Sequence, residues 1–134
     1  MKLIRVLVLE DDLPTLSVIM ARLASLEEKL GTTEFAVTTL SEYTQVEEYA
    51  NKTRHKFDLV LLDRDCKAGG SFHALDFDKY PANTIIGISS VPDYNKQLQQ
   101  RGITQTIWKD YKNLESFGNK LAVLIEQVIS AFKG

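Results

Sequence analysis

The stretch that decides the fold is Phe57-Asp58-Leu59-Val60-Leu61-Leu62-Asp63, which predicts a buried β-strand that stops at a carboxylate. Its apolar residues follow one another without the alternation of a half-exposed strand. This pattern is typical of a strand that is covered on both faces in a parallel sheet. Residues 4–9 have the same character and stop at the acidic residues 10–12. Two buried strands that end in carboxylates are therefore expected.

Three further strands are predicted from short runs rich in β-branched and apolar residues, at 35–40, 84–88 and 103–108. Helical patterns lie between the strands. Strands that alternate with helices imply right-handed βαβ crossovers, which build a parallel sheet with helices on both faces. The sequence therefore predicts an α/β fold with a doubly wound, five-stranded parallel sheet.

The first and last helices have the clearest patterns. Apolar residues recur at helical spacing over 16–30, with Asp12 as the expected cap, Pro14 in the first turn and Gly31 at the end. A single apolar stripe over 114–132 predicts the last helix.

Three shorter helices are expected between these two. Ser41 is the expected cap of a helix that follows the second strand, and a helix around 94–98 should end at Gly102. The third helix of the fold should be shortened to about two turns, at 72–79, because glycine, aspartate and proline leave little room around it.

Length, charge and composition exclude several classes of protein. At 134 residues the chain fits one domain, and its net charge of -2 gives no support for binding to nucleic acid or to an anionic membrane. No apolar stretch approaches the roughly 18 residues of a membrane span. The single Cys66 can form no internal disulfide, so a reducing cytoplasm is the expected location.

Polar residues stand directly after four of the predicted strands: Glu10 and Asp11, Asp63, Ser89 and Lys109. In a doubly wound sheet the ligand site lies outside the carboxyl ends of the strands, where the strand order reverses. Three carboxylates at one edge need a cation among them, and clustered oxygen ligands favour Mg²⁺. One carboxylate can then attack a phosphoryl group while the metal and the lysine neutralise its oxygens.

Together these residues resemble the receiver domain of response regulators in two-component signalling. Residues 6–12, Val-Leu-Val-Leu-Glu-Asp-Asp, are similar to the acidic-pocket motif of that family, and residues 57–63 are similar to its phospho-acceptor strand. The resemblance covers nearly the whole chain. It implies a flavodoxin-like fold with sheet order 2-1-3-4-5, as a single receiver domain over residues 1–134 without an output domain.

The resemblance also implies a signalling switch in a phosphorelay and not an enzyme. The implied partners are a histidine kinase or phosphotransfer protein that supplies the phosphoryl group, and a downstream protein or a second copy of the chain. The implied residue roles are Asp63 as phospho-acceptor, Glu10, Asp11, Asp63 and the backbone carbonyl of Asp65 as Mg²⁺ ligands, Ser89 as switch hydroxyl, and Lys109 as the phosphate-pairing cation.

Three positions depart from the family pattern. Thr106 stands where the family usually has an aromatic residue, and Asp110 replaces a proline, so a trans peptide bond is expected after Lys109. Lys67 replaces another proline and, with Arg64, adds positive charge near Asp63. These departures motivate an alternative, a receiver-like interaction module that does not depend on phosphate.

A second alternative is a phosphohydrolase of the haloacid dehalogenase type, because Asp63-Arg64-Asp65 resembles the nucleophile and acid/base pair of that family. That family carries its nucleophile after the first strand and a second acidic pair late in the chain. Here Glu10 and Asp11 precede Asp63, and no late acidic pair follows a strand. The order of the motifs therefore favours the receiver interpretation.

Other polar and aromatic residues have simpler interpretations. Ser90 is next to Ser89 and is a competing candidate for the switch hydroxyl. Trp108 suits either packing or an exposed partner surface, and the sequence leaves both open. Structural or exposed positions are expected for Cys66, His55 and His73, which have no partners at metal-ligand spacing.

Overall fold

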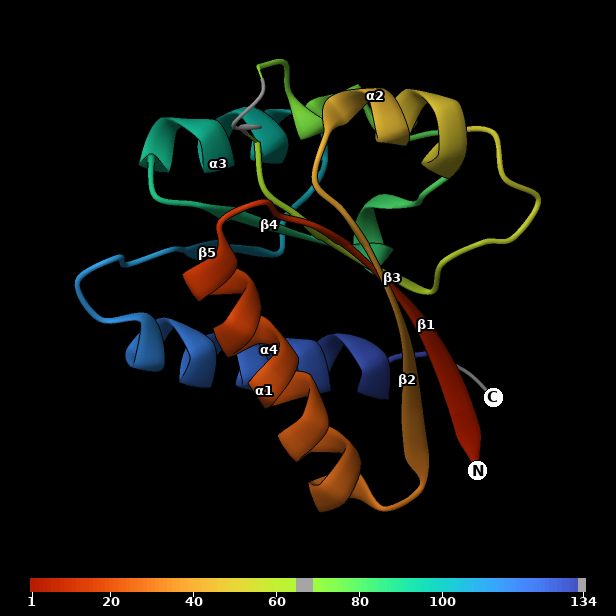
Figure 1. The fold of residues 1–134 in the computed structure, drawn as a ribbon, viewed down its shortest axis with the longest axis vertical. Coiled ribbons are helices and arrows are strands. Elements are labelled where there is room, and N and C mark those ends of the chain that lie inside the picture. The colour runs from red at the N-terminus through yellow and green to blue at the C-terminus, as the bar shows by residue number, and fades with distance from the viewer. Residues whose placement is uncertain (65–68, 133–134) are drawn as a thin grey trace.

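The computed structural model describes residues 1–64 and 69–132 and contains one sheet of parallel strands (Figure 1). The strand order is β2-β1-β3-β4-β5, as predicted for a doubly wound sheet. The strands are β1 Lys2–Leu9, β2 Thr33–Leu40, β3 Leu59–Leu62, β4 Ile85–Ser89 and β5 Thr106–Trp108.

Helices cover both faces of the sheet, which confirms the predicted layers (Figure 1). Helices α1 and α4 lie on one face and pack against each other. The opposite face carries α2, the single π-helical turn that continues it, and α3. The helices are α1 Leu13–Leu30, α2 Tyr43–Gln45 with the π turn Val46–Ala50, α3 Pro92–Gln100 and α4 Leu114–Ser130.

The helix ends follow local chemistry that the sequence already shows. The carboxylate of Asp12 accepts a hydrogen bond from the backbone N–H of Thr15 at 3.1 Å, which caps α1 as predicted. Gly31 ends the helix in the left-handed region, at φ 69°. On α4 the side chain of Asn113 accepts from the N–H of Ser116 at 3.0 Å.

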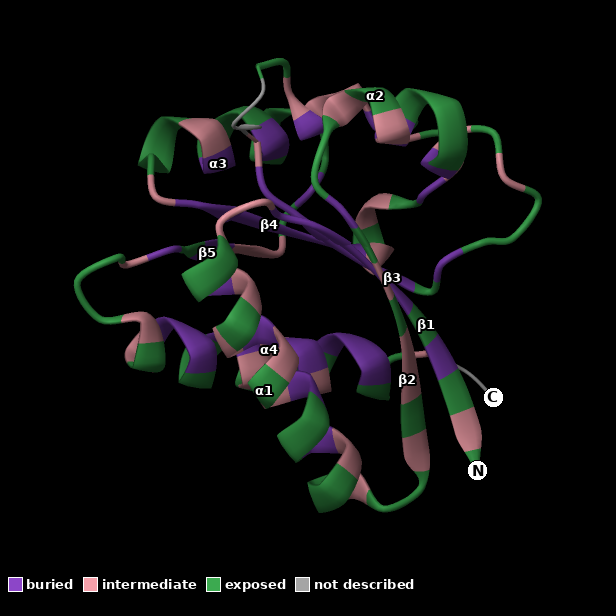
Figure 2. Cartoon of the chain, in the orientation of Figure 1, coloured by how far each residue is buried: buried purple, intermediate pink, exposed green. Residues whose placement is uncertain are grey.

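The sheet separates two apolar cores, and its central strands are buried on both faces (Figure 2). Alternate residues of β1 show the division, because Val6 and Val8 pack with α1 and α4 while Leu7 and Leu9 pack on the other side. All residues of β3 are buried. Burial on both faces therefore explains why apolar and polar residues do not alternate in the sequence of this strand, as predicted.

Two of the predicted helical details are wrong. The helix expected at 72–79 is a single 3₁₀ turn, Phe72–Ala74, and a second 3₁₀ turn, Ala82–Thr84, precedes β4. The cap of α2 is Glu42 and not Ser41, because Gln45, three residues after Glu42, forms a capping box with it.

Long-range side-chain hydrogen bonds explain why 72–79 does not continue as a helix. The amide of Asn51 binds the carbonyl of Ala74 at 2.9 Å and the N–H of Asp76 at 2.8 Å. The carboxylate of Asp76 then accepts from the N–H of Asp78 at 2.9 Å. These bonds occupy backbone groups that an α-helix would use, so the chain turns instead.

Gly118 on α4 allows the close approach of α1. A Cβ atom added there would lie 2.5 Å from Cγ1 of Val18 and 3.0 Å from Nε of Arg22. Val18 is β-branched and restricted to essentially one rotamer in a helix, so it cannot move aside without strain.

We predict that Gly118→Ala lowers the free energy of unfolding by about 1–3 kcal/mol, because overpacking outweighs the gain of about 1 kcal/mol in helix propensity. Urea denaturation measures the change. Asn119→Ala, at the exposed neighbouring position, is the control and should leave stability unchanged or slightly higher. A Gly118→Ala variant as stable as the control would contradict the packing argument.

Candidate functional site

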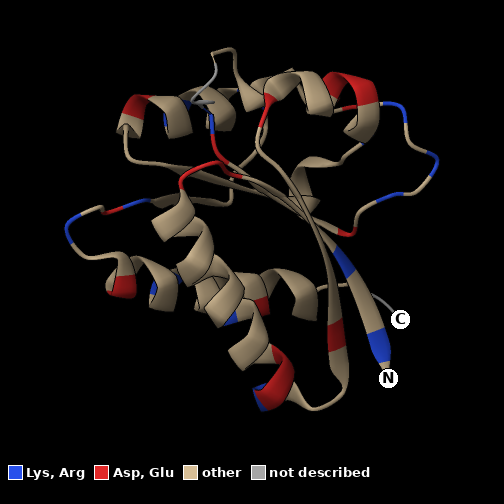
Figure 3. Cartoon of the chain, viewed as in Figure 1, with Lys and Arg blue, Asp and Glu red and all other residues tan. Residues whose placement is uncertain are grey.

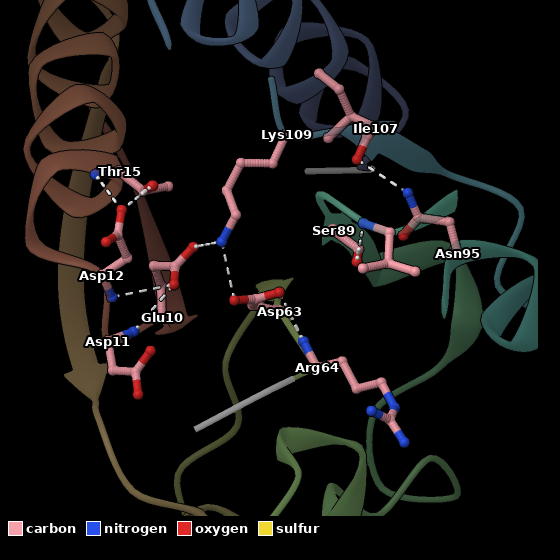
Figure 4. Close-up of polar contacts among 11 residues, drawn as sticks. Glu10, Asp11, Asp12, Thr15, Asp63, Arg64, Ser89, Asn95, Ile107 and Lys109 are labelled. Atoms are coloured by element: carbon pink, nitrogen blue, oxygen red, sulfur yellow. Dashed lines mark hydrogen bonds and ion pairs between the residues drawn. The ribbon is translucent and has the colours of Figure 1, made fainter. Parts of the chain in front are cut away.

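Four polar residues meet at the carboxyl edge of the sheet (Figure 4). Glu10 follows β1, Asp63 follows β3, Ser89 is the last residue of β4, and Lys109 follows β5. Backbone hydrogen bonds continue past the strand ends, from the N–H of Asp63 to the carbonyl of Leu9 at 3.0 Å and from the N–H of Lys109 to the carbonyl of Ser89 at 2.8 Å. The sheet itself therefore positions these side chains.

A buried ionic cluster forms the centre of the site. The ammonium of Lys109 lies 2.8 Å from Oε1 of Glu10 and 3.0 Å from Oδ2 of Asp63. Lys109 and Glu10 are each 2% exposed, and Asp63 is 8% exposed. Charged groups this deeply buried are costly unless they are paired, so the two carboxylates depend on the lysine between them.

The cluster shifts the pKa values of its members. Burial raises the pKa of Glu10 to about 7, and the neighbouring negative charge of Asp63 adds to this effect, while Lys109 opposes it. Burial by itself would lower the pKa of Lys109, but the charges of Asp63 and Glu10 outweigh it and raise the pKa. Lys109 therefore keeps its positive charge in the buried site.

Backbone groups orient the two carboxylates. Oε2 of Glu10 accepts from the N–H groups of Asp11 at 3.1 Å and Asp12 at 3.2 Å, and Oδ1 of Asp63 accepts from the N–H of Arg64 at 2.8 Å. Each carboxylate thus has one oxygen bound by the backbone and the other bound by the ammonium of Lys109. This arrangement fixes both carboxyl groups without any added ligand.

Among the residues described, Glu10, Asp11 and Asp63 form the one group of three metal-binding side chains. Their ligand atoms lie within 4.8 Å of one another. These three residues would hold a hard divalent cation such as Mg²⁺, because their donor atoms are all carboxylate oxygens. Asp65, the fourth predicted ligand, lies outside the described residues.

The hydroxyl of Ser89 accepts one hydrogen bond and can donate another. Ser89 is buried, and its Oγ accepts a hydrogen bond from the N–H of Val91 at 3.0 Å. The hydroxyl hydrogen remains able to donate to another acceptor at the carboxyl edge. The competing candidate, Ser90, is partly exposed, and its carbonyl accepts from Nε1 of Trp108 at 3.3 Å.

Comparisons with known proteins bear on the fold. No family model and no curated protein matches the sequence. Among solved structures, the non-phosphorylated receiver domain of HemR from Leptospira biflexa aligns with a TM-score of 0.62 at 19% identity, over 98% of each chain. The fold is that of response regulator receiver domains.

Two further receiver structures give the same result. A response regulator from Desulfuromonas acetoxidans aligns with a TM-score of 0.64 at 18% identity, over 97% of this chain and 99% of that one. TrrA from Thermotoga maritima, in complex with Mg²⁺ and BeF, aligns with a TM-score of 0.59 at 19% identity, over 96% and 99%. The predicted receiver fold and its sheet order are thus confirmed.

Thr106 and Trp108 both lie on β5, the edge strand of the sheet. The hydroxyl of Thr106 accepts a hydrogen bond from the side-chain amide of Gln99 on α3 at 3.0 Å. Trp108 is 56% exposed, so of its two predicted placements the structure has the exposed one. As predicted, the bond between Lys109 and Asp110 is trans, since no described peptide bond is cis. Lys67 lies outside the described residues.

Sequence reasoning did not find one contact beside the site. The guanidinium of Arg64 stacks over the ring of Tyr94, with 4.0 Å between its central carbon and the ring centre. The two residues lie on different elements, and no spacing in the sequence relates them. The sequence indicates only that Arg64 places a positive charge next to Asp63.

Charged residues of both signs are spread over the described chain (Figure 3). Lys and Arg lie on strands, helices and loops, with Asp and Glu among them (Figure 3). No helix in the described part of the chain is both long and apolar enough to cross a membrane.

The ionic cluster of Glu10, Asp63 and Lys109 should contribute to the free energy of unfolding. Without metal, Lys109→Met should lower the free energy of unfolding by about 3 kcal/mol or more, because it leaves two buried carboxylates unpaired. Asp63→Asn, which keeps the pair of Lys109 and Glu10, should cost far less. Urea denaturation tests both.

Addition of Mg²⁺ provides the matching control. The ion should restore part of the stability lost in Lys109→Met, because it replaces the missing positive charge beside Glu10 and Asp63. If Lys109→Met were as stable as the parent protein in metal-free buffer, the proposed dependence of the carboxylates on the lysine would be wrong.

Proposed function

We propose that the chain is a receiver domain that accepts a phosphoryl group on Asp63 and changes a protein contact in response. The observation that carries the proposal is the buried cluster of Glu10, Lys109 and Asp63 at the carboxyl edge of a receiver-type sheet. The structural similarity to TrrA, which was solved with Mg²⁺ and BeF, supports the same chemistry.

In this proposal an oxygen of Asp63 attacks the phosphorus of a phosphohistidine on a partner protein. A phosphorus–oxygen bond forms, the phosphorus–nitrogen bond breaks, and its electron pair stays with the leaving imidazole, which takes up a proton. Mg²⁺ held by Glu10, Asp11, Asp63 and the backbone carbonyl of Asp65 would supply positive charge that neutralises the phosphoryl oxygens.

Lys109 and Ser89 would then bind the product. The ammonium of Lys109 already lies 3.0 Å from Oδ2 of Asp63, and it would exchange Glu10 for a phosphoryl oxygen. The hydroxyl of Ser89 would turn from its contact with the N–H of Val91 and donate to a second phosphoryl oxygen. Motion of Ser89 would move the loop between β4 and α3.

The proposed setting is a cytoplasmic two-component phosphorelay. A histidine kinase or phosphotransfer protein would supply the phosphoryl group, and a downstream protein or a second copy of the chain would receive the signal. In this role residues 1–134 act as a single receiver domain and signal by contact, and turnover of a substrate is not part of the function.

A phosphorylation-independent interaction module is the second candidate, favoured by the hydrogen bond between Thr106 and Gln99. Thr106 stands at the position where receivers usually have an aromatic residue whose movement is coupled to that of the switch hydroxyl. The two candidates differ in one variant, because Asp63→Ala should abolish regulated binding of a partner in the first and leave binding intact in the second. The haloacid dehalogenase alternative gains no support, since Asp63 follows β3 and not the first strand.

We predict that incubation with acetyl phosphate and Mg²⁺ adds one phosphoryl group to the protein and none to Asp63→Asn, as measured by intact mass. Asp58→Asn is the control, because Asp58 is an exposed carboxylate near the start of β3 that binds the N–H of Arg5 at 2.9 Å. This control should be labelled like the parent protein. Labelling of Asp63→Asn, or no labelling of the parent protein, would contradict the proposal.

A second prediction concerns Trp108, the single tryptophan of the chain. Its indole N–H donates to the carbonyl of Ser90, so motion of Ser89 should change the environment of the ring. Beryllofluoride with Mg²⁺ should therefore change the fluorescence of Trp108, and Ser89→Ala should reduce the change. An equal change in both proteins would show that Ser89 does not transmit the signal.

A further inference from the structure

Arg64 connects the acceptor end of β3 to helix α3. Its backbone N–H donates to Oδ1 of Asp63 at 2.8 Å, while its guanidinium lies 4.0 Å from the centre of the ring of Tyr94. Both side chains are partly exposed. Figure 4 shows the side chain of Arg64 pointing away from the carboxylate of Asp63. The residue next to the acceptor is thus bound to α3 when Asp63 carries no phosphoryl group.

The stack on Tyr94 is weak compared with the contacts that a phosphoryl group offers. A cation over an exposed aromatic ring gains little free energy, whereas an arginine that binds phosphate forms charge-assisted hydrogen bonds, often two at once. A phosphoryl group on Asp63 would place nearly two negative charges one residue away from Arg64. The guanidinium would therefore exchange the ring for the phosphoryl oxygens.

Resting on the proposed function, we propose that Arg64 is a second phosphoryl-binding cation beside Lys109, and that its movement releases Tyr94 on α3. The two cations lie on different sides of Asp63, as Figure 4 shows for the ammonium of Lys109 and the side chain of Arg64. Phosphorylation is thereby coupled to α3 through Arg64, although position 106 carries no aromatic residue.

This arrangement makes Tyr94 a competitor of the phosphoryl group. In the fraction of molecules in which Arg64 is stacked on the ring, its guanidinium is not available to bind a phosphoryl group. The apparent affinity for a phosphoryl group is lowered in proportion to that fraction. Removal of the arginine and removal of the ring should therefore have opposite effects. A purely structural role for the stack would weaken binding in both variants.

The experiment measures the affinity for beryllofluoride in saturating Mg²⁺ by isothermal titration, with nitrogen and ring-proton NMR spectra of Arg64 and Tyr94. Arg64→Ala should weaken binding about tenfold, and Arg64→Lys should recover part of the loss. Tyr94→Leu should strengthen binding about two- to fivefold, while Tyr94→Phe keeps the ring and should bind like the parent protein. In the parent protein the Arg64 and Tyr94 signals should shift on binding.

Arg101→Ala is the matched control. Arg101 stacks on Phe77 at 4.1 Å, nearly the same geometry as Arg64 on Tyr94, but it lies at the far end of α3. This variant should bind beryllofluoride like the parent protein. Thermal unfolding of every variant separates a change in affinity from a loss of folded protein.

The outcomes separate the inference from the function on which it rests. If the parent protein does not bind beryllofluoride, the proposed function and the inference both fail. If it binds and Arg64→Ala matches Arg101→Ala, the phosphoryl-accepting function stands and the role of Arg64 is refuted. Weaker binding in Tyr94→Leu would also refute the inference, because the ring would then support binding and not compete with it.

Discussion

The ammonium of Lys109, buried between two carboxylates, is the interaction on which the rest of the site depends. Glu10 and Asp63 lie too close together and too far from water to remain charged without a cation. Lys109 supplies that charge. The same ammonium is also the group that would bind a phosphoryl oxygen, so one side chain both stabilises the resting site and takes part in the proposed reaction.

The sheet topology brings these three residues together. Strand β1 has β2 on one side and β3 on the other, so the strand order reverses next to the residues that follow β1 and β3. Glu10 and Asp63 therefore lie on either side of the same crevice, and Lys109 reaches it from the end of β5. Each buried strand ends where its apolar run ends, so the first polar residue after the run lies at the carboxyl edge of the sheet.

This constraint explains which features could be predicted from the sequence. Glu10 and Asp63 stand directly after buried strands and Lys109 directly after the edge strand β5, so the sheet topology predicts where they meet. The helix expected at 72–79 was wrong because Asn51, remote in sequence, occupies its backbone groups. The stack of Arg64 on the aromatic ring of α3 was also not predictable, because neither hydrophobic periodicity nor motif spacing records a contact between a loop and a helix.

The role of Lys109 is tested most directly by the position of its ammonium in a crystal structure of the protein with Mg²⁺ and beryllofluoride. We expect beryllium bonded to a carboxylate oxygen of Asp63, the metal bound by Glu10 and Asp11, and the ammonium on a fluorine instead of on Glu10. A structure in which Lys109 still bridges Glu10 and Asp63, with beryllofluoride absent from Asp63, would contradict this role.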